Sequence, residues 1–556
     1  MDEPPVGETP DRDGAFPRLS AGQIELLEND GRRRRTQVGE VLFRQGDPYE
    51  DFLVVLAGLV AMVDGDERSN SVIAVHGPGR FLGELSLLTG QAAFATAVVR
   101  EHGELLAVPV WRLRDLVAQN RGLGDVVLRA YLIRRELLIG AGAGLRIVGS
   151  RHSPDTWRLR EFAARNRLPH RWIDLDVDED AEGLLHGLGL APDETPVVLW
   201  LGREVLRNPS NVELARAVGL RSPHLEGTDY DVIVVGAGPA GLAAAVYAAS
   251  EGLSTITIDA EATGGQAGRS ASIENYLGFP AGISGGELAE RAVLQAEKFG
   301  ARIVVPATAV GTVWRNGHHE VRLDDGGAFT ARTVVIATGV RYRRLAVPGL
   351  DRLEPACVFY AATPSEARMC QARPVGVVGG GNSAGQAAAY LAQYAAEVYL
   401  IARDEELGQN MSRYLVDRIE RSPRVRVLRH TEVRELIGDD SLQAVIVEDL
   451  HSGDRRRLEL SELFVFCGAE PYTGWLADQL AVDPDGYLVT GGETVQGDGP
   501  PPLPLETSRP GVFAAGDVRS GATRRVASAV GEGAMAVRLV HERLRQGLSL
   551  RGPGGA

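Results

Sequence analysis

The stretch Tyr230–Ala260, YDVIVVGAGPAGLAAAVYAASEGLSTITIDA, decides the fold of the larger part of this chain. An apolar run of strand length enters a glycine-rich turn, an alanine-rich helix follows, and a second strand ends at Asp259. In such a turn the first glycine permits the tight bend, the second lets the backbone approach a pyrophosphate, and the third lets the helix pack on the strand. The acid is placed to bond a ribose hydroxyl. The stretch predicts a Rossmann-like dinucleotide-binding unit whose turn residues are Gly236, Gly238, Pro239, Ala240 and Gly241.

A second stretch of this kind lies about 140 residues further on. It is PVGVVGGGNSAGQAAAYLAQYAAEVYLIARD, Pro374–Asp404, with a G-x-G-x-x-A turn and a second strand that ends near Arg403. Two fingerprints in one chain predict two dinucleotides, one held permanently and one exchanged. The second turn contributes Gly379, Gly381, Asn382, Ser383 and Ala384.

From Tyr230 onward the order of motifs resembles the thioredoxin reductase family of flavoproteins. The further motifs are Gly264-Gly265-Gln266, IENYLG (273–278), VVIATG (334–339), PGVFAAGDV (510–518) and Arg524-Arg525-Val526. The resemblance implies that the first unit binds FAD, with Asp517 on its ribitol or pyrophosphate region, and that the second binds NADPH or NADH. Besides the first turn and Asp259, it implies a FAD site formed by Gly265, Gln266, Asn275, Gly339, Gly516, Asp517, Arg524, Arg525 and Val526.

The redox-active cysteine pair of that family is missing here. Counting back from Gly379, Ala362 and Ser365 occupy the two cysteine positions, and Glu366 occupies the position of the family's acid. A thiolate is the nucleophile that exchanges with a disulphide, so these residues do not support disulphide reduction. Glu366 is the candidate for proton transfer, with a plain helix-start carboxylate as the alternative. Cys357 and Cys370 flank the stretch and are expected to be ordinary buried thiols.

The coenzyme signal is mixed. The family grips the 2′-phosphate of NADPH with a His-Arg-Arg run, and this chain has Ala402-Arg403-Asp404 there. Arg403 suits a phosphate, whereas Asp404 suits the free 2′-hydroxyl of NADH. We expect NADPH to be the coenzyme, with NADH as the alternative.

The N-terminal part resembles cyclic-nucleotide-binding domains, on the strength of GEVLFRQGD (39–47) and FLGELSLL (81–88). The resemblance implies a nucleotide-like ligand held at Gly83, Glu84 and Leu85, with Glu84 on a ribose hydroxyl. The family's phosphate-binding arginine falls where Ala93 and Phe94 stand, and a buried phosphate without its cation is costly, so a cyclic nucleotide and another ligand both stay open.

The middle part resembles glutaredoxin and thioredoxin domains without their cysteines. Strands are expected at 145–150, 170–176, 196–201 and 203–206, and helices at about 156–167 and 211–218. Ser153-Pro154-Asp155-Thr156 stands where that family has C-P-x-C, and the resemblance implies a cis proline at Pro196. A structural role is expected, with Ser153 or Asp155 capping a helix.

Together these stretches predict a multidomain α/β chain: a small β-barrel with helices, a thioredoxin-like α/β domain, and two nested Rossmann-like domains. The expected boundaries are a disordered leader at 1–18, the cyclic-nucleotide-binding-like domain at 19–140, the thioredoxin-like domain at 145–222, a split FAD domain at 228–343 and 471–548, and the nicotinamide domain at 344–470.

Composition narrows the function classes. A net charge of −15 argues against a nucleic-acid partner. No apolar run is long enough to span a bilayer and the first residues do not read as a signal peptide, so a cytoplasmic location is expected. Three cysteines without a C-x-x-C spacing predict neither a disulphide framework nor a metal site.

Three functions fit these observations. The first is an NAD(P)H-dependent FAD oxidoreductase with a non-disulphide acceptor: a quinone, a ferredoxin or flavodoxin, or oxygen. The second is a low-turnover flavin sensor or scaffold biased by a ligand of the N-terminal domain. The third is a thioredoxin reductase that uses Cys357 or Cys370. The family resemblance also implies a homodimer.

Overall fold

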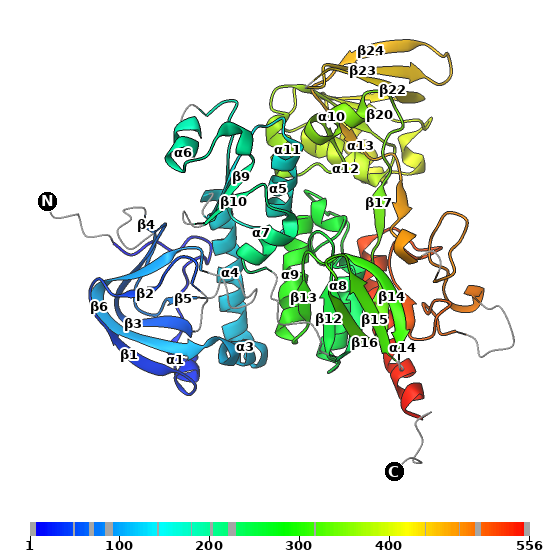
Figure 1. Cartoon of the computed structure of the whole chain (residues 1–556). Coiled ribbons are helices and arrows are strands. Elements are labelled where there is room, and N and C mark those ends of the chain that lie inside the picture. The colour runs from blue at the N-terminus through cyan, green and yellow to red at the C-terminus, as the bar shows by residue number, and fades with distance from the viewer. Residues whose placement is uncertain are drawn as a thin grey trace. The chain divides into compact units, whose positions relative to one another are not determined.

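The computed structural model describes residues 7–47, 51–65, 72–83, 93–141, 144–178, 181–200, 204–220, 229–315, 318–439, 441–476, 479–494 and 502–549. It divides into two compact units, one of residues 1–151 and 158–224 and one of residues 152–157 and 225–556. Each unit is described by itself (Figure 1).

The first unit begins with a six-stranded antiparallel sheet followed by two helices (Figure 1). The sheet order is β1-β6-β3-β4, with β2 on β6 and β5 on β3. Gly58 lies within β3 at φ +84°, where a side chain would strike the carbonyl of Glu101 on β6. The elements are α1 (Ala21–Glu28), β1 (Arg32–Thr36), β2 (Val41–Phe43), β3 (Asp51–Val63), β4 (Val72–His76), β5 (Phe81–Leu82), β6 (Thr96–Pro109), α3 (Val110–Gln119) and α4 (Arg121–Ala141).

Residues 7–18 correct one expectation, because they pack on this sheet instead of forming a disordered leader. The Thr9 N–H donates to the Val75 carbonyl at 3.1 Å, and the Val75 N–H donates to Thr9 Oγ1 at 2.8 Å. Ala15 and Phe16 are buried. The polar composition of this segment suggested disorder, but it does not account for the two buried apolar side chains or for the edge of β4 that bonds to Thr9. Residues 1–6 lie outside the described residues.

A four-stranded sheet of order β10-β9-β7-β8 completes the first unit. Strands β7 and β8 run parallel, and β9 is antiparallel to both β7 and β10. The four strands and two helices match the expected ranges, the Thr195–Pro196 bond is cis as expected, and the helix α6 was not expected. The elements are β7 (Leu145–Val148), α5 (Pro154–Arg165), β8 (His170–Ile173), α6 (Ala181–Gly187), β9 (Val197–Trp200), β10 (Glu204–Arg207) and α7 (Asn211–Ala217).

The second unit contains a seven-stranded sheet built from two separate parts of the chain. Its order is β13-β12-β11-β16-β15-β14, and β27 from the C-terminal part adds in parallel to β16. Strand β11 is the expected buried apolar run, paired in parallel with β12 and β16. The elements are β11 (Asp229–Val235), α8 (Pro239–Ser250), β12 (Thr255–Ile258), α9 (Gly285–Lys298), β13 (Arg302–Val304), β14 (Ala309–Arg315), β15 (His318–Leu323), β16 (Ala328–Ile336), β27 (Val512–Ala514) and α14 (Val526–Ser549).

A second Rossmann-like part lies between the two halves of this sheet in sequence. Its parallel sheet has the order β18-β25-β19-β20-β21, and the chain enters and leaves it through the antiparallel pair β17–β26. A separate antiparallel sheet holds β22, β23 and β24. The elements are β17 (Val340–Tyr342), α10 (Leu350–Cys357), β18 (Val358–Phe359), α11 (Pro364–Met369), β19 (Pro374–Val378), α12 (Asn382–Leu391), β20 (Glu397–Ile401), α13 (Arg413–Arg421), β21 (Val425–Leu428), β22 (Thr431–Ile437), β23 (Ala444–Asp449), β24 (Arg455–Glu459), β25 (Glu462–Val465) and β26 (Ala469–Pro471).

Candidate active site

The first glycine turn joins β11 to α8 with no room for side chains. Gly236 has φ +108°, and a Cβ there would strike the backbone of Ala337 in the 334–339 motif. A Cβ on Gly241 would overlap the Gly236 carbonyl oxygen. Gly238 caps α8 without any side-chain bond, and Pro239 opens the helix. The free N–H groups of this helix end therefore face the turn, which is how a pyrophosphate is bound.

Two further motifs close on the same turn from distant parts of the chain. A Cβ on Gly265 would come within 2.9 Å of Gly238 Cα, and a Cβ on Gly516 would come within 2.9 Å of Ala240 Cβ. The glycines of these three motifs therefore come together, because each approaches the first turn too closely to leave room for a side chain.

Asp259 lies at the end of β12 and braces the first turn. Its Oδ2 accepts the Ala237 N–H at 2.8 Å, and its Oδ1 accepts the N–H groups of Glu261 and Ala262 at 3.0 and 3.1 Å. The carboxylate is thereby fixed beside the place where a ribose next to the pyrophosphate would lie.

Two polar side chains near the turn have properties that suit a ligand-binding site. Gln266 Nε2 donates to the Val340 carbonyl at 3.1 Å, while its buried Oε1 has no partner in the described part of the chain. Burial raises the pKa of the Asp517 carboxyl, Arg524 opposes that rise and Glu532 adds to it. An orphaned buried acceptor and an uncapped helix end fit a large polar cofactor such as FAD.

Other residues of the expected flavin site lie more openly. Asn275 is exposed in the loop between β12 and α9, and Gly339 has φ +63° with open space beside it. Arg524 donates to the Tyr487 hydroxyl, and Arg525 and Val526 stand at the start of α14. Arg524 thus contacts Tyr487 while its charge also acts on Asp517.

The second glycine turn, between β19 and α12, has the same construction. Gly379 has φ +138°, and a Cβ there would lie 2.5 Å from the Phe466 carbonyl oxygen and 3.2 Å from Ala384 Cβ. Gly381 caps α12 without a side-chain bond. Asn382 Oδ1 accepts the Ser412 N–H at 2.7 Å, which ties the turn to the start of α13.

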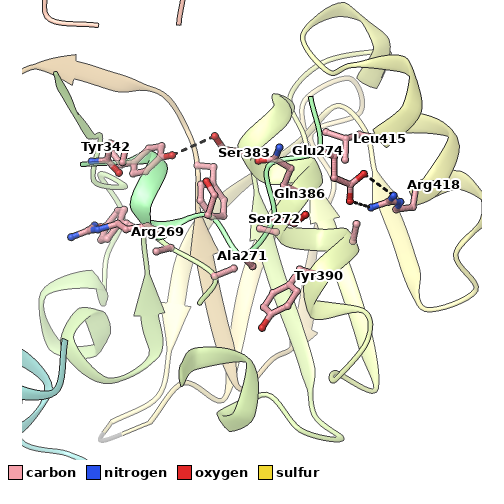
Figure 2. Close-up of a pocket in the computed structure, with 18 of the residues that line it drawn as sticks. Arg269, Ala271, Ser272, Glu274, Tyr342, Ser383, Gln386, Tyr390, Leu415 and Arg418 are labelled. Carbon is pink, nitrogen blue, oxygen red and sulfur yellow. Dashed lines mark hydrogen bonds and ion pairs between the residues drawn. The ribbon is translucent and has the colours of Figure 1, made fainter. Parts of the chain in front are cut away.

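A pocket lies between the two Rossmann-like parts of the second unit (Figure 2). Gln266 lines one side, and Ser383 and Ala362 line the other. Tyr342 donates its hydroxyl to Ser383 Oγ at 3.3 Å, and burial raises the Tyr342 pKa. The pocket also has a wall of aromatic and charged side chains, which cannot be predicted from the sequence because they come from segments far apart in the chain. These residues are Glu274, Tyr342, Tyr360, Tyr390, Arg418 and Phe466.

The site of the missing cysteines shows no thiol chemistry. Ala362 is buried, and Glu366 Oε2 accepts the N–H and hydroxyl of Thr363 at the start of α11. Burial raises the pKa of both the Cys357 and Cys370 thiols, which are free. Glu366 therefore has the geometry of a helix-start carboxylate, and neither thiol is poised as a thiolate.

The expected ligand site of the N-terminal domain is described only at its edge. Gly83 has φ +95°, whereas Glu84 and Leu85 lie outside the described residues. Ala93 and Phe94 are both buried, and the Phe94 ring lies edge-on to Trp200 with 6.2 Å between ring centroids. The positions of the phosphate-binding arginine thus hold two apolar side chains that face protein.

The described residues contain no cluster of acidic, histidine and cysteine side chains that could hold a metal ion. Among those same residues, no helix is long and apolar enough to cross a membrane.

Two glycine turns without side-chain caps, each following a parallel strand, and a pocket between the two Rossmann-like parts define a class: proteins with two dinucleotide sites, as flavoprotein oxidoreductases have. The family model for pyridine nucleotide-disulphide oxidoreductases matches residues 230–533, and the chain belongs to this family. The model for cyclic nucleotide-binding domains matches residues 33–120, so the chain also carries such a domain. FAD and NADPH are the cofactors of its thioredoxin reductase relatives, and the chain is, like them, a flavoprotein oxidoreductase.

Relatives and solved structures agree on this assignment. A thioredoxin reductase of Treponema pallidum is 36% identical over 310 residues, which is 56% of this chain and 95% of the relative. A structure of Lactococcus lactis thioredoxin reductase has 27% identity and a TM-score of 0.53, covering 57% of this chain and 99% of its own. A structure of T. acidophilum thioredoxin reductase has 30% identity and a TM-score of 0.52, covering 56% of this chain and 98% of its own.

Proposed function

We propose that this chain passes a hydride from a nicotinamide coenzyme to FAD and then reduces an acceptor that is not a disulphide. The observation that carries the proposal is the pocket between the two Rossmann-like parts, where Ala362 stands in place of a cysteine. The acceptor classes that need no thiol are a quinone, a ferredoxin or flavodoxin, and oxygen.

The binding residues divide between the two turns. The proposed flavin site comprises the first turn and Asp259, together with Gly265, Gln266, Gly516 and Asp517. The second turn, with Ser383 beside the pocket, is proposed for the coenzyme. Bound FAD would supply hydride acceptance and onward electron transfer.

The protein's own contribution is to position the reactants and exclude water. Gln266 offers an unpaired carbonyl oxygen within the pocket, and the rings of Tyr342, Tyr360 and Phe466 give the pocket apolar walls. Glu366 is bound by Thr363, which supports a structural role for it rather than proton transfer. The two thiols with raised pKa values argue against the route through Cys357 or Cys370.

The primary test is anaerobic stopped-flow mixing of the purified flavoprotein with NADPH and with NADH. Fast loss of flavin absorbance with a coenzyme, followed by reoxidation with a quinone, a redox protein or oxygen, is the expected result. A bound flavin that neither coenzyme reduces would refute the reductase and leave the sensor function.

The missing thiols can be tested by replacing them. The Ala362→Cys/Ser365→Cys double variant recreates a C-x-x-C pair beside the pocket, so we expect it to gain turnover of an aromatic disulphide such as dithiobis(nitrobenzoate). The parent chain is expected to show at least 10-fold less, since only thiolates exchange with disulphides. Disulphide turnover by the parent as fast as that of the double variant would contradict the proposal, and its loss in Cys357→Ala or Cys370→Ala would assign it to those thiols.

We further propose that a nucleotide-like ligand of the N-terminal domain regulates this enzyme. The match to cyclic nucleotide-binding domains supports a ligand of that class, and the buried Ala93 and Phe94 argue for one that does not need an arginine-bound cyclic phosphate. A homodimer is proposed on the family resemblance, and sedimentation velocity tests it.

A further inference from the structure

The second nucleotide turn carries an acid that the family's NADPH site does not call for. A Cβ on Gly380, the middle residue of the turn, would overlap Oδ2 of Asp404. The Asp404 carboxylate therefore lies directly against the backbone of the turn. It is half-buried, and within the described part of the chain it has no hydrogen-bond or ion-pair partner. Its acceptor oxygens are available to a ligand that reaches the turn.

The first Rossmann-like part of the same chain shows what an acid in this place does. There Asp259 Oδ2 contacts Ala237, which is the middle residue of the first turn just as Gly380 is of the second. The strand ends differ, because Ala402 follows β20 where Asp259 follows β12, and Asp404 folds back to supply the carboxylate. FAD, which we propose for the first nucleotide turn, has an adenosine with a free 2′-hydroxyl. With FAD bound there, the acid against the turn would face an unphosphorylated ribose.

The surrounding charge also opposes a 2′-phosphate. The run Arg403-Asp404-Glu405-Glu406 has one cation against three acids. The Arg403 side chain is 66% exposed, and its Nη1 lies 3.9 Å from Glu432 Oε1. Glu432 in turn pairs with Arg434 at 2.9 Å. A phosphate here would meet Asp404 at close range with a single solvated arginine to offset it, and like charges at that distance disfavour binding.

We infer that Asp404 makes the second nucleotide site of this chain selective for NADH over NADPH, unlike the NADPH sites of its relatives. The carboxylate accepts hydrogen bonds from the adenosine ribose hydroxyls of NADH and repels the 2′-phosphate of NADPH. This inference rests on the proposed coenzyme site at the second turn and adds to it a residue that sets specificity.

The test is isothermal titration calorimetry of the FAD-loaded full chain with NAD⁺ and with NADP⁺, which needs no turnover. We expect NAD⁺ to bind at least 10-fold more tightly, and the Asp404→Asn variant to lose most of that ratio. Glu405→Gln is the matched control. It removes the same charge from the neighbouring residue, whose side chain is exposed. It is expected to keep the ratio within about 2-fold, since an exposed charge is largely screened.

Each outcome decides the matter. Equal or tighter binding of NADP⁺ would overturn the inference. So would a Glu405→Gln variant that loses as much of the NAD⁺-to-NADP⁺ affinity ratio as Asp404→Asn does. If neither nucleotide binds while the flavin stays in place, the coenzyme site itself fails, and the inference fails with it. Retained flavin absorbance and an unchanged unfolding temperature show that Asp404→Asn is folded.

Discussion

At the scale of single residues, His319 is the clearest case of a side chain whose ionisation the fold controls. It lies in β15 with no exposed surface. Its pKa is lowered from the ordinary 6.5 to about 4, mainly by burial, with Arg509 adding to the shift and the Pro510 backbone opposing it. The native chain therefore keeps His319 neutral in a pH range where the unfolded chain protonates it.

This predicts that the FAD-binding sheet loses stability in weak acid. As the pH falls from about 6.5 to about 4, the unfolded state takes up a proton that the native state refuses, and the loss approaches about 3 kcal/mol. His319→Phe removes this titration and should flatten the dependence. The measurement is the flavin-release temperature at pH 7.5 and pH 5; equal slopes for parent and variant would contradict it.

At the scale of elements, helices α8 and α14 come into contact through a glycine. A Cβ on Gly533 of α14 would overlap the Ala240 carbonyl oxygen of α8. A Cβ on Gly531, two residues earlier in the same helix, would have nothing within 4 Å. Close approach of these helices holds α8, and with it the first nucleotide turn, against the C-terminal part of the chain.

We predict opposite results for two matched substitutions on α14. Gly533→Ala should force the helices apart, lower the free energy of unfolding by about 1–3 kcal/mol and weaken FAD retention, because the clash is with backbone. Gly531→Ala should be neutral or stabilising by up to about 1 kcal/mol, because alanine favours a helix. Thermal unfolding followed by flavin fluorescence measures both; a stable, flavin-loaded Gly533→Ala variant would refute the close contact.

The elements that could be predicted from sequence are those whose signal is local. The two glycine turns, the strands on either side of them and the middle-domain strands follow from apolar runs and turn chemistry over a few residues. The packing of Phe16, the helix α6 and the pocket walls could not be predicted, because they depend on contacts between distant segments. The place of Asn275 in the flavin site rests on a motif alone, and because its side chain is exposed, that place stays a prediction.

At the scale of the whole molecule, a charged pair beside the pocket joins the two Rossmann-like parts of the second unit (Figure 2). Arg418 of α13 donates from Nη1 and Nη2 to the two carboxylate oxygens of Glu274, at 2.7 and 2.9 Å. Both side chains are partly exposed, so the pair adds little to folding stability. It bears instead on the position of the nicotinamide part, which the β17–β26 ribbon connects to the flavin part.

We predict that breaking this pair changes turnover and not folding. Glu274→Gln should shift the rate constant of flavin reduction by about 3-fold or more with an unfolding temperature close to that of the parent, since movements of one domain against another gate turnover in many enzymes. The charge-reversed pair Glu274→Arg/Arg418→Glu should restore the parent rate. Stopped-flow bleaching checks all three proteins, and a double variant no better than the single one would contradict the role of the pair.

The split sheet has a consequence for synthesis on the ribosome. Strand β27 must pair with β16, yet about 175 residues separate their positions in the chain. At roughly 5–20 residues per second, on the order of ten seconds or more pass between translation of the two strands. During that interval the inserted part can fold, while β16 waits with only the stretch Val334–Ile336 of one edge uncovered. A nascent chain is therefore expected to gain its flavin late, only after α14 has emerged from the exit tunnel.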